Sequence, residues 1–340
     1  MTARMQVDLA AFEQNLVAVR NRVSPAELML VVKDDAYGHG LAVIVNRATA
    51  CGVRWFGAFD VATGIRVREI AGEQARIFVW MLSGPEQARA ACAAGLDIGV
   101  GSMQVLEDVA AVGSERVHLK VDTGLHRNGI RPEQWPHAVA RAREHEAEGR
   151  IRVIGVWSHI AEASDAEDDA ARAVFDNAVR QAHRAGLNPE IRHLAASAAA
   201  CSRPEFRYEL ARVGAFCYGI RSAGEPAQRS LGIRAIGSVR ASVVDIEGGS
   251  VSLGIGSLDG LPSTLSGRFW VTTSAGQRRV TAVGRDALTV ESWPGVRVGD
   301  EVIVAGAGAC SYTDLAESMD TIGEEIAVRI SPLLPREYCS

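Results

Sequence analysis

The sequence predicts a (β/α)8 barrel followed by a second, all-β domain, and three observations support this prediction. A chain of 340 residues exceeds the size at which one hydrophobic core usually stops growing. Between residues 25 and 220, short apolar runs alternate with polar turns and segments of helical spacing. After about residue 225, short β-branched runs alternate with Gly, Ser and Asp-rich turns. We therefore place the domains at 1–225 and 226–340, and leave open whether the first residues pair with the β domain.

The barrel prediction depends on eight apolar runs that do not alternate with polar residues. Parallel strands covered on both faces have this pattern. The runs are residues 27–33, 55–59, 75–82, 96–101, 116–122, 151–159, 190–197 and 211–219. The clearest helix lies between the sixth and seventh runs, at 168–186, where Ala171, Phe175 and Ala178 share one face, acidic residues occupy the first turn and Gly186 closes the end.

Composition narrows the class of partner. Hydrophobic residues make up 47% of the chain and charged residues 23%, which is typical of a globular protein. The net charge of -5, from 36 Lys and Arg against 41 Asp and Glu, gives no basic surface of the kind that attracts nucleic acid or an anionic membrane. We therefore expect a small-molecule partner.

Cysteine spacing and the chain's opening bear on compartment and metal content. Six cysteines are scattered with no C-x-x-C spacing, which argues against a metal site, a redox pair or a disulfide framework. The opening "MTARMQVDLAAFEQNL" lacks the features of a signal peptide, and no apolar run approaches the roughly 20 residues that a membrane span needs. We expect a cytoplasmic protein without a metal ion.

Polar residues stand at the ends of several predicted strands. Taken alone, each would be a solvated charge or a satisfied core residue, but a barrel directs the carboxyl ends of its strands towards one mouth, where barrel enzymes have their active sites. The residues are Lys33 after the first run, Lys120, Asp122 and Arg127 at or after the fifth, His159 at the end of the sixth, Ser197 at the end of the seventh and Arg212 at the start of the eighth.

This combination suits one cofactor. A lysine desolvated among such groups becomes a nucleophile towards an aldehyde and can carry a Schiff base. Ser197 and the backbone around Gly214 could hold a phosphate, while Arg212 could face a ring nitrogen. Pyridoxal 5'-phosphate requires these three elements together.

Five segments carry a resemblance to a known family. "VVKDDAYGHG", "LKVDTGLHRNGI", "VWSHIAEAS", "HLAASAAA" and "ARVGAFCYGI", in this order and on these strands, resemble the signature segments of the alanine racemase family. "VDLAAFEQNL" at 7–16 is similar to the family's opening, and "TIGEEIAVRISPLLPREY" at 321–338 to its close. The resemblance therefore covers most of the chain.

The resemblance implies a pyridoxal-phosphate enzyme that forms a head-to-tail homodimer, in which each site borrows residues from the partner's β domain. It implies that Lys33 is the Schiff-base lysine and that Arg127 lies near the substrate carboxylate. Lys120 matches a lysine that is carbamylated in many members and orients this arginine. The cofactor-binding residues would be Lys33, Tyr37, His159, Ser197, Arg212, Gly214 and Ala215.

The chain departs from the family where the substrate would bind. The resemblance implies two bases, a lysine and a partner tyrosine in a G-Y-x-D-G segment, but the corresponding "GIGSLDG" has Ser257 at the tyrosine position. The family's Met-Asp pair corresponds to Arg285 and Asp286, so the candidate catalytic residues are Lys33, Ser257, Arg127 and Asp286. Three further departures are Asp34-Asp35 after the lysine, Ala196 before the phosphate-site serine and Pro332 in place of a phosphate-contacting tyrosine.

Three functions stay open. The first is an amino-acid racemase or epimerase, with Lys33 serving one face of Cα and a substrate other than alanine. The second is a decarboxylase, retro-aldolase or β-eliminase on the same fold, because such reactions need one acid-base group and tolerate Ser257. The third is a non-catalytic protein that binds pyridoxal phosphate. The retained β domain, which the family uses to complete its site, argues against the third.

Overall fold

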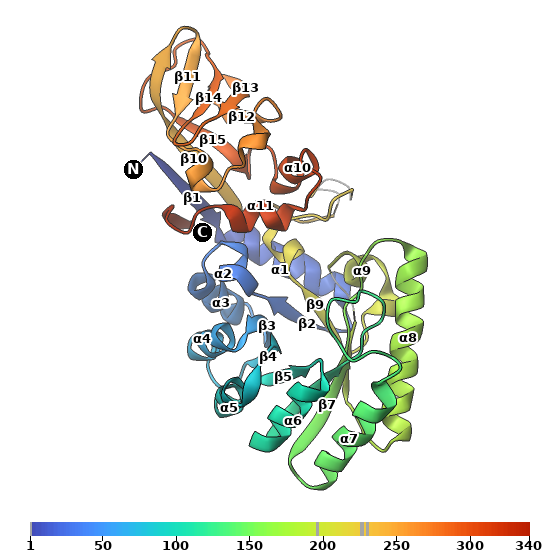
Figure 1. Cartoon of the computed structure of the whole chain (residues 1–340). Helices are drawn as coiled ribbons and strands as arrows, with labels where there is room; N and C mark the ends of the chain where they lie inside the picture. The colour runs from blue at the N-terminus through green and yellow to red at the C-terminus, as the bar shows by residue number, and fades with distance from the viewer. Residues whose placement is uncertain (1, 195–196, 225–227, 229–230) are drawn as a thin grey trace. The chain divides into compact units, whose positions relative to one another are not determined.

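The structure is a computed structural model that describes residues 2–194, 197–224, 228 and 231–340 (Figure 1). The chain divides into two compact units. The first contains Met1–Ala18, Asp34–Arg47 and Ala215–Ser340, apart from the residues outside the described ranges, and the second contains Val19–Lys33 and Ala48–Gly214. Ala196, which precedes the predicted phosphate-site serine, lies outside the described residues.

The second unit is the predicted barrel. Within the described ranges its sheet has eight parallel strands, in the order β8-β7-β6-β5-β4-β3-β2-β9. The strands are β2 (Glu27–Val31), β3 (Trp55–Asp60), β4 (Arg76–Met81), β5 (Asp97–Val100), β6 (Ser114–Lys120), β7 (Ile151–Trp157), β8 (Ile191–His193) and β9 (Leu210–Val213). Each of the eight predicted runs overlaps one of them, and Figure 1 shows helices along the outside of the sheet.

The helices follow the strands as a barrel requires. They are α4 (Val61–Ala71), α5 (Gly84–Ala93), α6 (Met103–Val112), α7 (Trp135–Ala147), α8 (Asp165–Arg184), the short α9 (Ser197–Ser202) and a 3-10 turn, η1 (Pro204–Phe206). Helix α8 confirms the predicted helix and buries Ala171, Phe175 and Ala178. It begins three residues earlier than predicted because the Ser164 hydroxyl accepts a hydrogen bond from Glu167 N (3.3 Å) and caps the helix at that point.

Side chains connect the two edge strands of the sheet, β8 and β9. Arg192 on β8 donates through Nε to Oε2 of Glu209, the residue before β9, at 2.9 Å. Arg212 on β9 donates through Nη1 to the carbonyl oxygen of His193 on β8, also at 2.9 Å. These contacts bring the open edges of the sheet together and nearly close the barrel.

Large apolar side chains fill the barrel. A buried cluster contains Met29, Trp55, Phe78, Trp157 and Leu210, which come from five different strands. A glycine on β5 makes room for two of the rings, because a Cβ on Gly99 would lie 3.0 Å from both Phe78 and Trp157. The barrel is therefore a packed core, and chemistry is restricted to its ends.

The first unit contains the predicted β domain. Its sheet, counted over the described residues, has eight strands in the order β11-β14-β13-β12-β15-β10-β1-β16. They are β1 (Ala3–Asp8), β10 (Gly237–Glu247), β11 (Ser250–Leu253), β12 (Trp270–Thr273), β13 (Gly276–Val283), β14 (Leu288–Glu291), β15 (Glu301–Gly306) and β16 (Arg336–Cys339). The first residues of the chain belong to this sheet, since Met5 pairs with Val239 in antiparallel and with Arg336 in parallel register.

Short helical segments accompany this sheet, beyond the all-β pattern that the sequence indicates. They are α10 (Tyr312–Glu317), α11 (Gly323–Arg329) and the 3-10 turns η2 (Ala215–Tyr218), η3 (Ser257–Asp259) and η4 (Ser263–Leu265). Helix α10 begins with a capping box, in which the Ser311 hydroxyl accepts from Asp314 N and the Asp314 carboxylate accepts from Ser311 N. Helices α1 (Leu9–Val23) and α3 (Leu41–Ala50) each contain residues of both units.

Within the described part of the chain, no helix is both long and apolar enough to cross a bilayer. All six cysteines lie in the described ranges, and none of them forms a disulfide.

A buried asparagine on α1 holds two connecting segments of the first unit. The Asn15 side chain is fully buried and donates to the carbonyl oxygens of Arg234 (2.7 Å) and Cys217 (3.2 Å). Its Oδ1 accepts from the Arg234 amide at 2.8 Å. Each of these three hydrogen bonds thus gives a partner to a backbone N–H or C=O group that the helices and sheets leave unpaired.

We expect Asn15→Leu to lower the free energy of unfolding by about 2 kcal/mol or more, because buried backbone groups would lose their partners. Urea denaturation followed by circular dichroism measures the change. Gln14→Leu is the matched control, since Gln14 is the preceding residue and makes only an exposed hydrogen bond to the Arg234 side chain. Equal stability of the two variants would contradict this role of Asn15.

Candidate active site

Lys33 lies two residues beyond the end of β2, at the start of an unusual turn. Strand β2 ends at Val31, and the next residue, Val32, donates its amide to the Gly57 carbonyl at 2.9 Å. The four residues after Lys33 have positive φ angles of 54°, 53°, 56° and 54°, so the segment α2 (Lys33–Tyr37) is a left-handed turn. Each non-glycine residue in this conformation costs roughly 1–2 kcal/mol. Such strain persists only where the surroundings impose it, which often marks a functional site.

Hydrogen bonds hold the turn in place. The Gly38 amide donates to the Asp34 carbonyl (2.9 Å), and the Gly40 amide to the Asp35 carbonyl (3.0 Å). The Asp35 carboxylate accepts from the Leu41 amide at 2.9 Å, at the first residue of α3. Asp35 therefore has a structural role in starting this helix.

Arg212 on β9 is the centre of a buried polar cluster at the carboxyl ends of the strands. Its guanidinium donates to Ser158 O (2.6 Å), His193 O (2.9 Å), His193 Nδ1 (2.9 Å), Leu194 O (3.2 Å) and His159 Nδ1 (3.3 Å). Burial and the nearby Arg127 lower the pKa of Arg212 to about 9, which leaves it a cation at neutral pH.

His159 follows β7 and meets this cluster. Burial and the positive charges of Arg212, Arg127, Lys120 and Lys33 hold the pKa of His159 well below its usual range. The imidazole is therefore neutral, and its Nδ1 is the atom that accepts from Arg212. The structure thus brings His159, Arg212 and the charge of Lys33 together at one end of the barrel, as the sequence predicts.

Lys120, at the end of β6, is almost completely buried, with 3% exposure. Its ammonium lies 4.3 Å from the centre of the Trp157 ring and donates to Oδ1 of Asn128. Burial, Arg212 and Arg127 lower the pKa of Lys120 to about 7, against an opposing effect of Asp122. A large fraction of Lys120 is therefore an uncharged amine at neutral pH.

Arg127 and Asn128 reach the cluster from a loop that folds back on β6. The Ile130 amide donates to Lys120 O and the Asp122 amide to Ile130 O, both at 2.9 Å. The close approach needs a glycine, because a Cβ on Gly129 would lie 2.9 Å from Asp122 N. Arg127 is exposed to solvent, which suits a group that meets an incoming carboxylate.

Two hydrogen-bond donors converge where a phosphate is expected. The Gly214 amide, which follows β9, donates to Oγ of Ser197, the first residue of α9, at 3.3 Å. The Ser197 hydroxyl can donate in turn, so this hydroxyl and the backbone N–H, together with Arg212 on β9, form a donor set that fits the phosphate and ring of pyridoxal phosphate.

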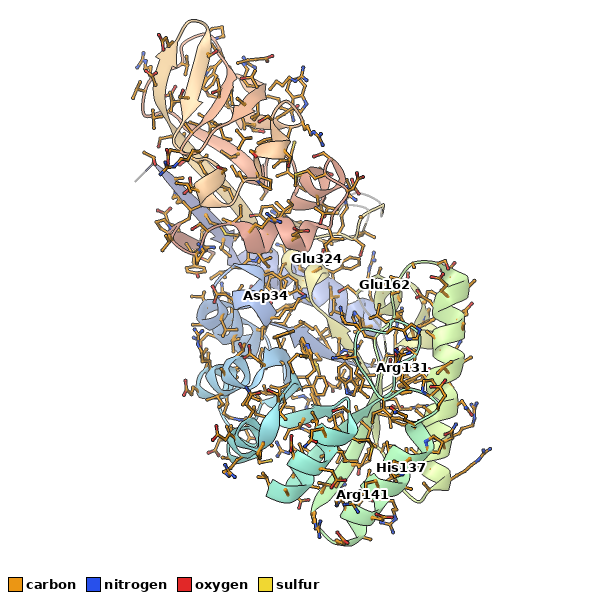
Figure 2. The ribbon with its side chains drawn as sticks, viewed as in Figure 1. Asp34, Arg131, His137, Arg141, Glu162 and Glu324 are labelled. Carbon is orange, nitrogen blue, oxygen red and sulfur yellow. The ribbon has the colours of Figure 1, made fainter. Side chains whose placement is uncertain are left out.

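Tyr37 and Ala215 belong to the first unit. Ala215 begins η2 and is buried. Burial and the carboxylates of Glu324 and Asp34, both labelled in Figure 2, raise the pKa of Tyr37 well above its usual range. Its phenol therefore stays protonated and can donate a hydrogen bond.

Ser257 and Asp286 lie on neighbouring segments of the β domain. The Ser257 amide donates to Gly284 O (2.9 Å) and the Leu258 amide to Arg285 O (3.1 Å). The surrounding side chains face solvent, with 61% exposure for Leu258, 78% for Arg285 and 73% for Asp286. The chain thus presents the two candidate catalytic residues of the β domain on one exposed surface. Pro332, which follows α11, is also exposed.

His193, His118 and Asp97 connect to Arg212 inside the barrel and are not among the residues that the strand-end pattern predicts. One further feature of the sequence points to the site. Lys33 and Lys120 are the only lysines among 36 basic residues, so both lysines of the chain lie at this end of the barrel.

The fold and the donor set define a barrel enzyme with a site for pyridoxal phosphate, and comparison with known proteins identifies the family. Residues 7–222 match the family model "Alanine racemase, N-terminal domain" and residues 239–338 match "Alanine racemase, C-terminal domain". The chain therefore belongs to the alanine racemase family, whose members depend on pyridoxal phosphate, and the cofactor prediction is confirmed.

Relatives resemble the chain over nearly its whole length. It is 35% identical to an alanine racemase of Thermobifida fusca over 369 residues, covering 99% of this chain and 98% of that protein. A structure of the alanine racemase from D-cycloserine-producing Streptomyces lavendulae superposes with a TM-score of 0.94 at 30% identity, over 100% of this chain and 97% of that one. The Streptomyces coelicolor A3(2) alanine racemase gives the same TM-score at 31% identity, over 100% and 98%. These comparisons support an enzyme of the racemase kind and do not favour a lyase.

We expect Lys120 to react with carbon dioxide, because its neutral amine can form a carbamate whose negative charge would lie close to Arg127 and Arg212. The free-amine fraction rises as the pH rises through about 7. Carbon-13 NMR of protein in labelled bicarbonate at pH 8 should show a carbamate signal that survives in Lys33→Ala and disappears in Lys120→Met, beside any signal of the chain's α-amino group. A signal lost only with Lys33 would contradict the assignment.

Proposed function

We propose that this protein is a pyridoxal-phosphate-dependent amino-acid racemase or epimerase that acts on a substrate other than alanine. Pyridoxal phosphate, when bound, delocalises the electron pair left on Cα of an amino acid after proton loss. The observation that carries the proposal is the convergence of Lys33, His159 and Arg212 at one end of the barrel. Ser197 and Gly214 would hold the phosphate, and the family resemblance adds Tyr37 and Ala215 to this role.

In this proposal Lys33 carries the cofactor and then moves the Cα proton on one face of the substrate. A lysine amine within reach of Cα can accept a proton from that face and return it. Arg127 would bind the substrate carboxylate, because a guanidinium pairs with both carboxylate oxygens.

Arg212 would face the ring nitrogen of the cofactor. A guanidinium with a pKa of about 9 donates a hydrogen bond at pH 7 but keeps its proton. Arg212 would therefore leave the ring nitrogen unprotonated, a setting that favours proton exchange at Cα over other reactions of the same substrate.

The second face of Cα requires a group from the β domain, and Ser257 stands where the family has a tyrosine. A serine hydroxyl is shorter than a phenol and a much weaker acid, so it would transfer a proton only through a water molecule or a neighbouring group. Asp286 lies on the adjacent segment and is exposed. We propose that these residues complete the site of a partner subunit in a head-to-tail homodimer.

The serine at position 257, in place of the family's tyrosine, also supports a larger substrate. Loss of a phenol ring leaves room beside Cα for a side chain longer than a methyl group. Arg285 and Asp286 also place charges at this surface. The relatives in the comparisons are named alanine racemases, so the proposal of another substrate depends on these local differences.

To test the reaction, we would incubate the cofactor-loaded protein with D- and L-amino acids in deuterated water. Cα exchange is followed by proton NMR and configuration by chiral chromatography. We expect exchange with inversion, fastest for an amino acid larger than alanine. Exchange with retention, or release of an amine, aldehyde or keto acid, would favour the one-base alternatives, and alanine as the best substrate would overturn the substrate proposal.

We expect Ser257→Tyr to raise alanine racemisation by roughly tenfold or more, because a positioned acid-base group typically contributes 10²–10⁴-fold. Leu258→Tyr is the matched control, since it adds a tyrosine one residue away on the same exposed turn. Chiral chromatography of product from each enantiomer measures both variants. Equal rates would show that position 257 does not serve the second face.

A further inference from the structure

A line of hydrogen-bonded side chains runs through the barrel from Arg212 to the opposite end. Arg212 Nη1 lies 2.9 Å from His193 Nδ1, and His193 Nε2 lies 2.9 Å from His118 Nδ1. His118 Nε2 lies 3.2 Å from Oδ1 of Asp97, the first residue of β5. Both histidines and Asp97 are fully buried. The line therefore connects the amino end of β5 with the carboxyl-end cluster at Arg212.

The two ends of the line determine the direction of every hydrogen bond. Arginine can only donate, so His193 must accept at Nδ1 and carry its proton on Nε2. His193 then donates to His118 Nδ1, which leaves the His118 proton on Nε2, and that proton is donated to the Asp97 carboxylate. One tautomer of each histidine satisfies the whole line.

The surroundings keep both histidines neutral and in place. Burial lowers the pKa of His118 and of His193. The Phe78 ring packs edge-on against both imidazoles, at 5.1 Å from His118 and 5.0 Å from His193. A glycine makes room on β7, because a Cβ on Gly155 would lie 2.1 Å from His118 Nδ1. The line thus runs from the Arg212 cation to the Asp97 carboxylate, which also pairs with Arg76 (Nε to Oδ2, 2.9 Å), and the two rings between them are neutral.

We propose that Asp97 and His118 are positioning residues for Arg212, and that they act by fixing the tautomer of His193. This inference rests on the proposed function, in which Arg212 faces the cofactor ring. With the carboxylate present, only the Nε2–H tautomers make every hydrogen bond. His193 then always presents a lone pair to Arg212 and holds the guanidinium in one orientation.

Loss of the carboxylate charge removes this control. The asparagine side chain in Asp97→Asn can accept or donate a hydrogen bond, so His118 and His193 can both switch to the Nδ1–H tautomer. A reversed His193 carries a proton on Nδ1, which opposes the N–H of Arg212. The guanidinium then loses one of its buried acceptors and shifts. Comparable carboxylates that orient metal-binding histidines typically change activity by roughly 10–100-fold when they are mutated.

The test is nitrogen-15 NMR of the cofactor-loaded protein labelled on histidine, with the two signals assigned from His118→Asn and His193→Asn. In the wild type we expect Nε2–H tautomers for both residues, and in Asp97→Asn a mixture that includes Nδ1–H. Glu190→Gln is the matched control, because Glu190 precedes β8 and pairs with Arg152 (2.6 Å) without contacting the line. The control should retain the wild-type tautomers.

Kinetics give the second readout. We expect the kcat for Cα exchange to fall roughly tenfold or more in Asp97→Asn, with KM within about twofold, and to stay unchanged in Glu190→Gln. Nδ1–H tautomers in the wild type would overturn the inference, and so would an unchanged kcat in Asp97→Asn of an active enzyme. The tautomers need no turnover, so an inactive wild type with Nε2–H histidines would overturn the proposed function and leave the line of hydrogen bonds established.

Discussion

The buried guanidinium of Arg212 is the constraint on which the site depends. A buried charge is tolerated only when its donors are satisfied, and Arg212 reaches acceptors on segments at the ends of β7 and β8. It can do so only because parallel strands bring their carboxyl ends to one edge. The same contacts connect the edge strands β8 and β9, so barrel closure and the assembly of the site share one residue. Burial and the positive charge of Arg212 together lower the pKa of His159 and of Lys120, which favours the neutral form of both groups.

Local sequence patterns predicted the barrel well because its strands are buried on both faces and read as unbroken apolar runs. The strand-end rule then placed Lys33, Lys120, His159 and Arg212 at one mouth. The line through His193, His118 and Asp97 was not predictable in this way. Asp97 opens a strand and resembles a solvated turn residue, while the two histidines meet across β7, between strands that are not neighbours. Contacts across a barrel depend on strand order and tilt, which residue spacing does not record.

The β domain was less predictable from its sequence than the barrel. Its β-branched runs predicted a sheet, but the capping box of α10 and the inclusion of β1 in that sheet became clear only from the structure. Ser257 and Asp286 lie 29 residues apart in sequence and are brought to adjacent segments by backbone hydrogen bonds at Gly284 and Arg285. The barrel side of the site carries the lysine and arginine cluster, whereas the exposed β-domain side carries Ser257, Arg285 and Asp286, where the sequence predicts departures from the family. This contrast is the physical basis for proposing an unchanged cofactor and a changed substrate.

Lys33 is the residue that we propose to bind the cofactor as a Schiff base, and because the chain has only two lysines this role is simple to test. We would load the protein with pyridoxal phosphate, reduce it with borohydride and locate the modified lysine by peptide mass mapping. We predict a phosphopyridoxyl group on Lys33 alone, and no adduct in Lys33→Ala, in which Lys120 remains. Modification of Lys120 in the wild type, or a protein that takes up no cofactor, would contradict the account.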